Sequence, residues 1–370
     1  MPENSAGLKQ KLIRLGQALV DQEKARIIVS PAQRGYGYWF GGGNIVTDNS
    51  GTLYSCGRYR NAGDSRVGIG AGARGFELAI FSSRDGGKNF EKRRSFSKSD
   101  LSHGQQEVIS IERSWINTNE DKVELYISTE KAGIPYPKGL EHFKKANTGV
   151  WTIDIMEANS IETLDPKNIR PLLRGDDPRF YHFKDPFVFT NSRNDTVLVF
   201  CTHPFNWTSS NAAYAVRPAG ATDFGKPDLT FFPRGFAWDV AISRLTNVLH
   251  LPPTGILENL QPVYLCFYDG GESIRNYEEH AQAVKRPRGY SCEELGGLGF
   301  FLEEEFPSIE RLSINLPMFI SPYGTGCSRY FSTLSTEDGI YTSWMQSQED
   351  LSQPLVLHFL SMNEVKSILR

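Results

Sequence analysis

The chain has 370 residues, of which 39% are hydrophobic and 22% charged, so it can bury a core and is not disordered. Aromatic residues make up 12%, and 34 Gly and 20 Pro punctuate the chain, which favours many short strands over long helices. The net charge of -3 gives no support for a protein that binds nucleic acid or anionic membranes, since either would show a basic excess.

The first 25 residues predict one amphipathic helix, because Leu8, Leu12, Leu15 and Leu19 recur at helical spacing. The segment lacks the apolar core of a signal peptide, and no apolar run approaches the ~18 residues of a membrane span. The five cysteines form no CxxC pair, and several lie inside apolar runs, as small buried thiols do in a reducing compartment. We therefore expect a cytoplasmic protein.

From residue 26 onward the pattern changes to short β-rich runs bounded by turn-forming residues. These runs group in fours, and the first strands of the five groups begin near residues 41, 106, 184, 238 and 328. The last group lacks a fourth strand, whereas residues 26–30 (RIIVS) have no group, so pairing them would close a ring. We predict an all-β fold over 26–370: a single catalytic domain that is a five-bladed β-propeller with four-stranded blades. A β-sandwich is the alternative.

The first strand of each propeller blade lines the central channel. The expected entrances of these strands carry Asn44, Glu107, Asp185, Asp239 and Arg329. Acid–base cleavage of a glycosidic bond needs two carboxylates, and a third can raise the pKa of a neighbour. The three acids therefore predict a catalytic centre; the alternative is that they only mark turns before strands.

Other polar side chains are expected around the same channel mouth. Candidates at strand ends and in loops are Arg58, Arg60, Arg66, Glu130, His203, Asp269 and Glu272. Arginine suits bidentate binding of a carboxylate or of sugar hydroxyls. His182 and Lys184 flank Asp185, and Trp39 could stack on a sugar ring or serve the core. No cofactor is predicted, although the many oxygen ligands leave room for a structural Ca²⁺ in the channel.

One local motif is more specific for a fold than the residues described so far. Residues 83–90 (SRDGGKNF) match S-x-D-x-G-x-x-F/W and resemble the Asp box of sialidases. In that turn the Ser and Asp side chains satisfy backbone groups, and Gly supplies the left-handed φ. The motif is typical of propeller blades and lies on their outside.

The chain resembles the five-bladed glycoside hydrolases related to arabinanases, invertases and neoagarobiose hydrolases over about residues 26–365. Residues 184–189 (KDPFVF) are similar to the Asp-Pro motif of an inner strand in that clan, which implies that Asp185 tunes the general acid. The clan usually places its base on the first inner strand, where this chain has three glycines and Asn44, so the base could shift to Glu107. Asp239 is then the candidate acid, and Glu294, in the long charged loop 272–295, competes with it.

Sialidases are the second resemblance, through the Asp box and the arginines. They normally have six blades and use a tyrosine nucleophile, which implies Tyr323, Tyr330 or Tyr341 as candidates.

These observations predict a glycoside hydrolase, exo-acting on a short oligosaccharide, with no nucleic-acid or membrane partner. Two alternatives stay open. One is an enzyme on an acidic sugar, either sialidase-like or a lyase with His182 or a tyrosine as base. The other is a non-catalytic propeller that binds carbohydrate or protein, because this fold hosts many functions.

Overall fold

The computed structural model describes residues 5–35, 37–61, 74–119, 122–144, 148–177, 180–203, 210–271, 295–321, 323 and 328–370. The candidate site residues Arg66, Glu272 and Glu294 lie outside these ranges.

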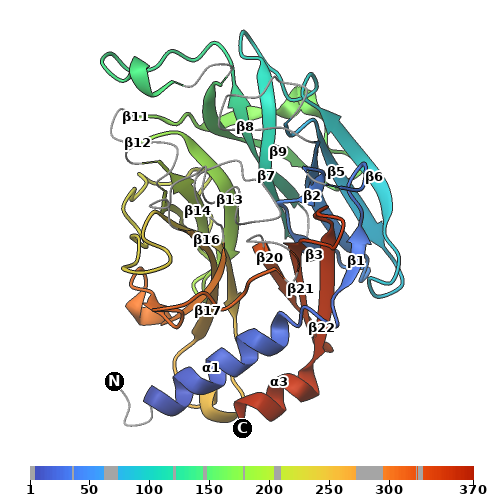
Figure 1. Cartoon of the computed structure of the whole chain (residues 1–370), viewed down its shortest axis with the longest axis vertical. Helices are drawn as coiled ribbons and strands as arrows, with labels where there is room; N and C mark the ends of the chain where they lie inside the picture. The colour runs from blue at the N-terminus through green and yellow to red at the C-terminus, as the bar shows by residue number, and fades with distance from the viewer. Residues whose placement is uncertain are drawn as a thin grey trace.

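The described residues form a five-bladed β-propeller, as predicted (Figure 1). Blade 1 contains β2 (Trp39–Gly41), β3 (Ile45–Thr47), β4 (Leu53–Arg60), β5 (Glu77–Ser83) and β6 (Glu91–Ser97). Blade 2 contains β7 (Val108–Asn119), β8 (Lys122–Lys131), β9 (Val150–Ala158) and β10 (Arg170–Leu173). Blade 3 contains β13 (Phe183–Thr190), β14 (Thr196–Thr202) and β15 (Asn211–Arg217), preceded by the hairpin β11 (Asp176–Asp177) and β12 (Phe180–Tyr181). Blade 4 contains β16 (Ile242–His250), β17 (Val263–Gly271), β18 (Leu295–Leu302) and β19 (Glu310–Arg311).

Blade 5 closes the ring with a strand from the other end of the chain. It contains β20 (Ser328–Ser335), β21 (Gly339–Gln346), β22 (Leu355–Ser361) and, as its outer strand, β1 (Arg26–Val29). β1 pairs antiparallel with β22, with Arg26 opposite Leu357 and Ile27 opposite Val356. The predicted closure is confirmed, and it leaves the ring with no unpaired gap between its first and last sheets.

Two details differ from the prediction. The predicted grouping in fours implies a fourth strand in blade 3, but among the described residues this blade has three, with one bridge from Tyr214 to Asp228. Phe231 and Phe232 are instead buried in the core. The chain also ends in a helix that the sequence did not predict, α3 (Met362–Leu369), capped by Ser361 and Glu364 in a capping box.

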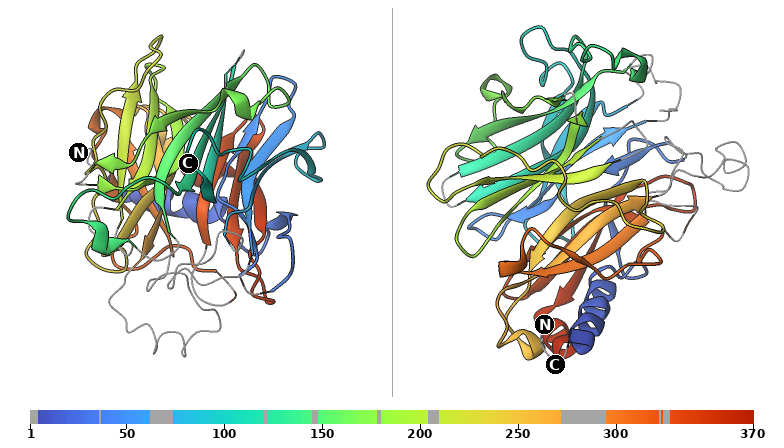
Figure 2. Two further views of the ribbon diagram at one scale, coloured as in Figure 1. Left: turned by 90° about the horizontal axis from the view of Figure 1, so that it is seen from above. Right: turned by 90° about the vertical axis from the view of Figure 1, so that its left-hand side faces the viewer.

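The predicted N-terminal helix is α1 (Ser5–Leu19), and it lies beside α3 at one edge of the ring (Figures 1 and 2). Its four leucines are buried in one core cluster with Leu265, Leu298 and Trp344 of blades 4 and 5. Gly16 lets α1 approach β18 closely, because a Cβ there would lie 2.6 Å from Leu298 Cδ2. No helix in the described part of the chain has the length and hydropathy needed to cross a bilayer.

The turn at residues 83–90 joins β5 to β6. Ser83 Oγ donates to Asp85 Oδ1 (2.7 Å) and accepts from the Gly87 amide (2.9 Å). The Asn89 amide donates to Asp85 Oδ1 (3.0 Å). The turn therefore satisfies its backbone with its own side chains.

Removing one of the α1 leucines tests whether this helix stabilises the ring. Leu12 is fully buried, so Leu12→Ala should lower the free energy of unfolding by about 2–4 kcal/mol. Gln17→Ala, on the exposed face of the same helix, should change it by less than about 0.5 kcal/mol. Urea denaturation of both variants measures this; equal stabilities would mean that the helix packs only loosely.

Candidate active site

Each of the five inner strands is interrupted where it lines the channel. The ladder shifts register between Ile111 and Ser114 in β7, and between Lys184 and Phe187 in β13. It shifts again between Leu245 and Asn247 in β16, and between Arg329 and Ser332 in β20. In blade 1 the interruption separates β2 from β3 at residues 42–44. Such bulges re-aim side chains, and here they bring charged residues into the channel.

The bulge in β7 presents Glu112. Its carboxylate accepts a hydrogen bond from Ser110 Oγ (3.0 Å) and pairs with Arg58 Nη2 (3.2 Å). Burial by itself raises the pKa of Glu112, but the positive charges of Arg58 and Lys184 outweigh burial and lower it. The Glu112 side chain is 13% exposed, whereas Asp185 and Asp269 are almost fully buried. Glu112 is therefore an ionised carboxylate that solvent can reach.

Arg58 extends from β4 into the space above the first inner strand. Its Nη1 donates to the Gly41 carbonyl (3.1 Å), and a Cβ on Gly42, whose φ is 70°, would lie 1.7 Å from that nitrogen. Gly42 thus makes room for a guanidinium, whereas Gly41 and Gly43 make room for Met345 and for the Cys56 backbone. An arginine, and not an acid, is therefore the charged side chain beside residues 41–42 of the first inner strand.

Tyr330, in the β20 bulge, lies between guanidinium groups. Tyr330 has a φ of 57°, a strained backbone conformation for a bulky residue, so contacts with the surrounding blades must hold this conformation. Arg58 Nη2 donates to its hydroxyl (3.4 Å), and Arg329 also contacts that oxygen. The Arg329 guanidinium lies 4.1 Å from the centre of its ring.

Asp185 lies at the β13 bulge, also with a φ of 57°. Its Oδ2 accepts from Arg244 Nη1 (3.4 Å) and lies 4.0 Å from Lys184 Nζ. Burial by itself raises the pKa of Asp185, but the charges of Lys184 and Arg244 outweigh burial and hold it well below its usual range. Asp185 also acts on the titration of Glu112, so the two carboxylates share one electrostatic environment.

Asp269 and Arg113 complete the buried charges of the centre. Asp269 accepts from the Tyr330 amide (3.3 Å) and faces Arg329 Nε at 3.8 Å; burial raises its pKa. Arg113 donates from blade 2 to the Thr246 carbonyl (2.6 Å), and burial lowers its pKa to about 10. Arg113 therefore stays charged and joins blade 2 to blade 4 across the channel.

A second group of polar residues lies where blades 2 and 3 meet. Glu130 forms a buried ion pair with Arg74 and accepts from the Gly149 amide (2.7 Å); burial raises its pKa. Its register partner on β7 is Ser110, which binds Glu112. His182 and His203 lie beside Trp151, whose ring also faces Lys184 Nζ at 5.3 Å.

The structure gathers some predicted site residues and separates others. Arg58, Lys184, Asp185, Asp269 and Arg329 share the central cluster, and Trp39 stacks on Arg58 and Arg60. His182 and His203 belong to the neighbouring group.

Three predicted residues have other surroundings. Glu107 is exposed before β7. The Asn44 side chain is bound to the backbone of Ile116: it accepts from the Ile116 amide and donates to the Ile116 carbonyl, both at 2.8 Å. Asp239 pairs with Arg311 Nε (2.9 Å) of the outer strand β19.

Sequence reasoning missed Glu112, Arg113 and Arg244. All three lie inside strands, whereas site residues were expected at the ends of strands and in loops. The signal was present: Glu112 and Arg113 are adjacent charges between the apolar residues Ile111 and Trp115, and buried charges of this kind are rare without a partner. Within the described ranges, no group of three or more His, Cys, Asp or Glu side chains could hold a metal ion.

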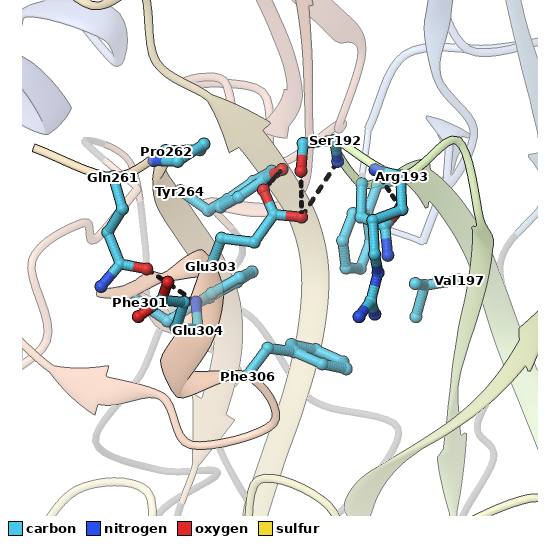
Figure 3. Close-up of a pocket in the computed structure, with 12 residues that line it drawn as sticks. Ser192, Arg193, Val197, Gln261, Pro262, Tyr264, Phe301, Glu303, Glu304 and Phe306 are labelled. Atoms are coloured by element: carbon cyan, nitrogen blue, oxygen red, sulfur yellow. Dashed lines mark hydrogen bonds between the residues drawn. The ribbon is translucent and has the colours of Figure 1, made fainter.

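A separate cavity of about 350 Å³ lies between blades 3 and 4 (Figure 3). Its wall includes Tyr264 and Phe301, stacked with centroids 4.7 Å apart. Glu303 points inward but is already bound by Ser192 Oγ (2.7 Å) and by the Tyr264 hydroxyl (2.8 Å). No residue of the central cluster lines this cavity.

No family model matches the chain, and no curated protein matches it. Its fold is nevertheless shared with solved structures. The protein BT0996, solved as an RGII complex, has a TM-score of 0.60 at 10% identity, with 95% of each protein covered. The β-xylosidase RS223 has a TM-score of 0.55 at 10% identity, covering 92% of this chain and 95% of the other. A GH43_1 enzyme from Xanthomonas citri, complexed with xylotriose, has a TM-score of 0.51 at 11% identity, covering 95% and 93%.

Cutting the Asp185–Arg244 pair tests how far the buried charges depend on one another. Arg244→Gln should lower the free energy of unfolding at neutral pH by about 3–5 kcal/mol, because it leaves a buried carboxylate with less compensation. The pKa of Asp185 is depressed in the folded state, so its stabilisation is present above the ordinary pKa and is lost as pH falls. The difference between wild type and variant should therefore shrink below about pH 4.

Urea denaturation between pH 3 and pH 7 measures this difference. Arg193→Gln is the matched control, because Arg193 is 78% exposed and its pair with Asp195 should contribute less than about 1 kcal/mol. A similar small loss for Arg244→Gln would show that the pair is not energetically coupled.

Proposed function

We propose that this chain is a glycoside hydrolase that acts at the centre of the ring. The observation that carries the proposal is Glu112, a partly exposed carboxylate with a lowered pKa, electrostatically coupled to the buried Asp185. Acid–base cleavage of a glycosidic bond requires an ionised carboxylate and a protonated carboxyl; the pKa of Glu112 is lowered, whereas burial raises that of Glu130. The fold shared with a β-xylosidase is consistent with this chemistry.

The carboxyls divide by their surroundings. Glu112, ionised and open to solvent, is assigned as the base or nucleophile. Asp185, ionised and buried, is assigned to tune it and to orient the sugar. Glu130 is the register partner of Ser110, which binds Glu112, and burial raises the pKa of Glu130; we therefore assign Glu130 as the proton donor. Glu294, from the sequence analysis, is the competing donor.

The burial of the centre suits an exo-acting enzyme with a short oligosaccharide. Glu112 and Arg329 are 13% and 12% exposed at their side chains, while the carboxylates behind them are almost fully buried. Such a site admits the end of a glycan more readily than the middle of a chain.

Replacing Glu112 tests this assignment. Glu112→Gln should lower kcat/KM by about 10²–10⁴-fold, because an amide cannot act as base or nucleophile. Glu107→Gln, which changes an exposed acid at the start of the same strand, should leave it unchanged. The assay is release of aryl aglycones and cleavage of oligosaccharides, acidic sugars included. Full activity in Glu112→Gln would refute the assignment.

A second candidate is favoured by Tyr330. Its hydroxyl is contacted by Arg58 and Arg329, and hydrogen bonds from cationic donors stabilise negative charge on a phenol oxygen. The same guanidinium groups suit a substrate carboxylate. The alternative is thus a hydrolase of an acidic sugar with Tyr330 as nucleophile.

Tyr330→Phe separates the two candidates. With Glu112 as nucleophile, it should cost about tenfold in kcat/KM, the value of one hydrogen bond. With Tyr330 as nucleophile, the loss should exceed about 10²-fold, and only substrates with a carboxylate should turn over. Mass spectrometry after a slow fluorinated substrate would place the trapped sugar on one residue or the other. An ultraviolet-absorbing unsaturated product would instead identify a lyase.

A further inference from the structure

Tyr136 lies in the loop between β8 and β9, beside the site described above. It is half-buried, and its hydroxyl lies 3.1 Å from His182 Nε2. Its ring packs on Tyr181 at 4.4 Å between centroids, and the Tyr181 hydroxyl is held by the Pro135 carbonyl. The phenol is therefore fixed in place from two sides.

The direction of the His182 hydrogen bond follows from the other ring nitrogen. The Trp151 amide donates to His182 Nδ1 (3.3 Å), so this nitrogen is an acceptor and carries no proton. Burial, together with the nearby His203 and Lys184, holds the pKa of His182 well below its ordinary value. The neutral ring thus carries its proton on Nε2, which donates to the Tyr136 oxygen.

The Tyr136 hydroxyl hydrogen must then point away from His182. Within the described residues, no acceptor forms a hydrogen bond with it. Burial raises the pKa of Tyr136, with the neighbouring Tyr181 and Glu130 adding to the effect. The group therefore remains a hydrogen-bond donor rather than a base.

This donor belongs to the same region as the candidate catalytic residues. His182 lies two residues before Lys184 and three before Asp185. Trp151, which fixes the histidine, is the register partner of Glu130, and Glu130 acts on the titration of Tyr136. His182 has a left-handed φ of 86°; its ring contacts Tyr136, and Lys184, two residues on, lies 4.0 Å from Asp185.

We propose that Tyr136 is a specificity-determining residue that donates its hydrogen bond to an acceptor oxygen of the bound glycan, with His182 as its positioning residue. The proposal rests on the proposed hydrolase function for its substrate class. A hydroxyl, ring or carboxylate oxygen at this place satisfies the donor, and a sugar that lacks the oxygen leaves it buried and unpaired.

The arrangement can be tested without turnover. Nitrogen-15 NMR of the histidines should show His182 as the neutral tautomer protonated at Nε2, with no titration near the ordinary histidine pKa of about 6.5. Tyr136→Phe should leave this tautomer unchanged, because the Trp151 amide fixes it. A histidine protonated at Nδ1, or one that titrates near pH 6.5, would overturn the proposed pairing.

Kinetics on the glycosides that turn over test the role. Tyr136→Phe should lower kcat/KM about fivefold to tenfold, mainly through KM, with an unchanged pH profile. His182→Asn should have the same effect, since asparagine tolerates the left-handed backbone but lacks a donor in reach of Tyr136. The double variant should be no worse than either single one.

Tyr214→Phe controls for the loss of a phenol and should change nothing, because Tyr214 lies in β15, the described strand of blade 3 farthest from the inner strand β13. Wild-type kinetics in Tyr136→Phe, or additive losses in the double variant, would refute the proposal. If no glycoside is cleaved, the proposed hydrolase function is wrong. The role of Tyr136 is then tested by calorimetry of binding to the oligosaccharides used in the activity assay. Weaker binding in Tyr136→Phe then supports the proposal, and equal or undetectable binding overturns it.

Discussion

The burial of charged side chains on the channel axis is the constraint on which the rest of the structure depends. Asp185, Asp269 and Arg113 are almost fully removed from water, and each would be costly alone. They are tolerated because partners arrive from different blades: Arg244 for Asp185, Arg329 for Asp269, and the carbonyl of Thr246 for Arg113. A site of this kind exists only when all five blades are in place.

Ring closure therefore has a chemical consequence as well as a structural one. β1 seals blade 5 against the far end of the chain, and the two terminal helices pack under blades 4 and 5. Tyr330 and Arg329 belong to that last blade. The N-terminal residues thus support, through the sheet, Tyr330, which contacts Arg58, and Arg329, which pairs with Asp269.

The interruptions in the inner strands turn a regular scaffold into a site. A continuous strand would place alternate side chains in the channel and in the space between blades. The bulges aim adjacent residues differently, so Glu112 and Arg113 both take part in the centre. The left-handed backbone at Asp185 and Tyr330 is strained, and the packing of the closed propeller holds both residues in this conformation.

The sequence by itself determined the repeated short strands, the amphipathic α1, the closure through residues 26–29 and the central place of Asp185, because alternation, turn residues and helical spacing are local properties. It could not determine which acids face one another. Glu107 and Glu112 lie on the same predicted strand, and only the bulge decides that Glu112 pairs with Arg58. Asp239 is paired with Arg311 from an outer strand, and Arg58 is the charged side chain beside Gly41 and Gly42. A one-residue shift in register reverses the direction of a side chain, and register is set by contacts between strands far apart in the chain.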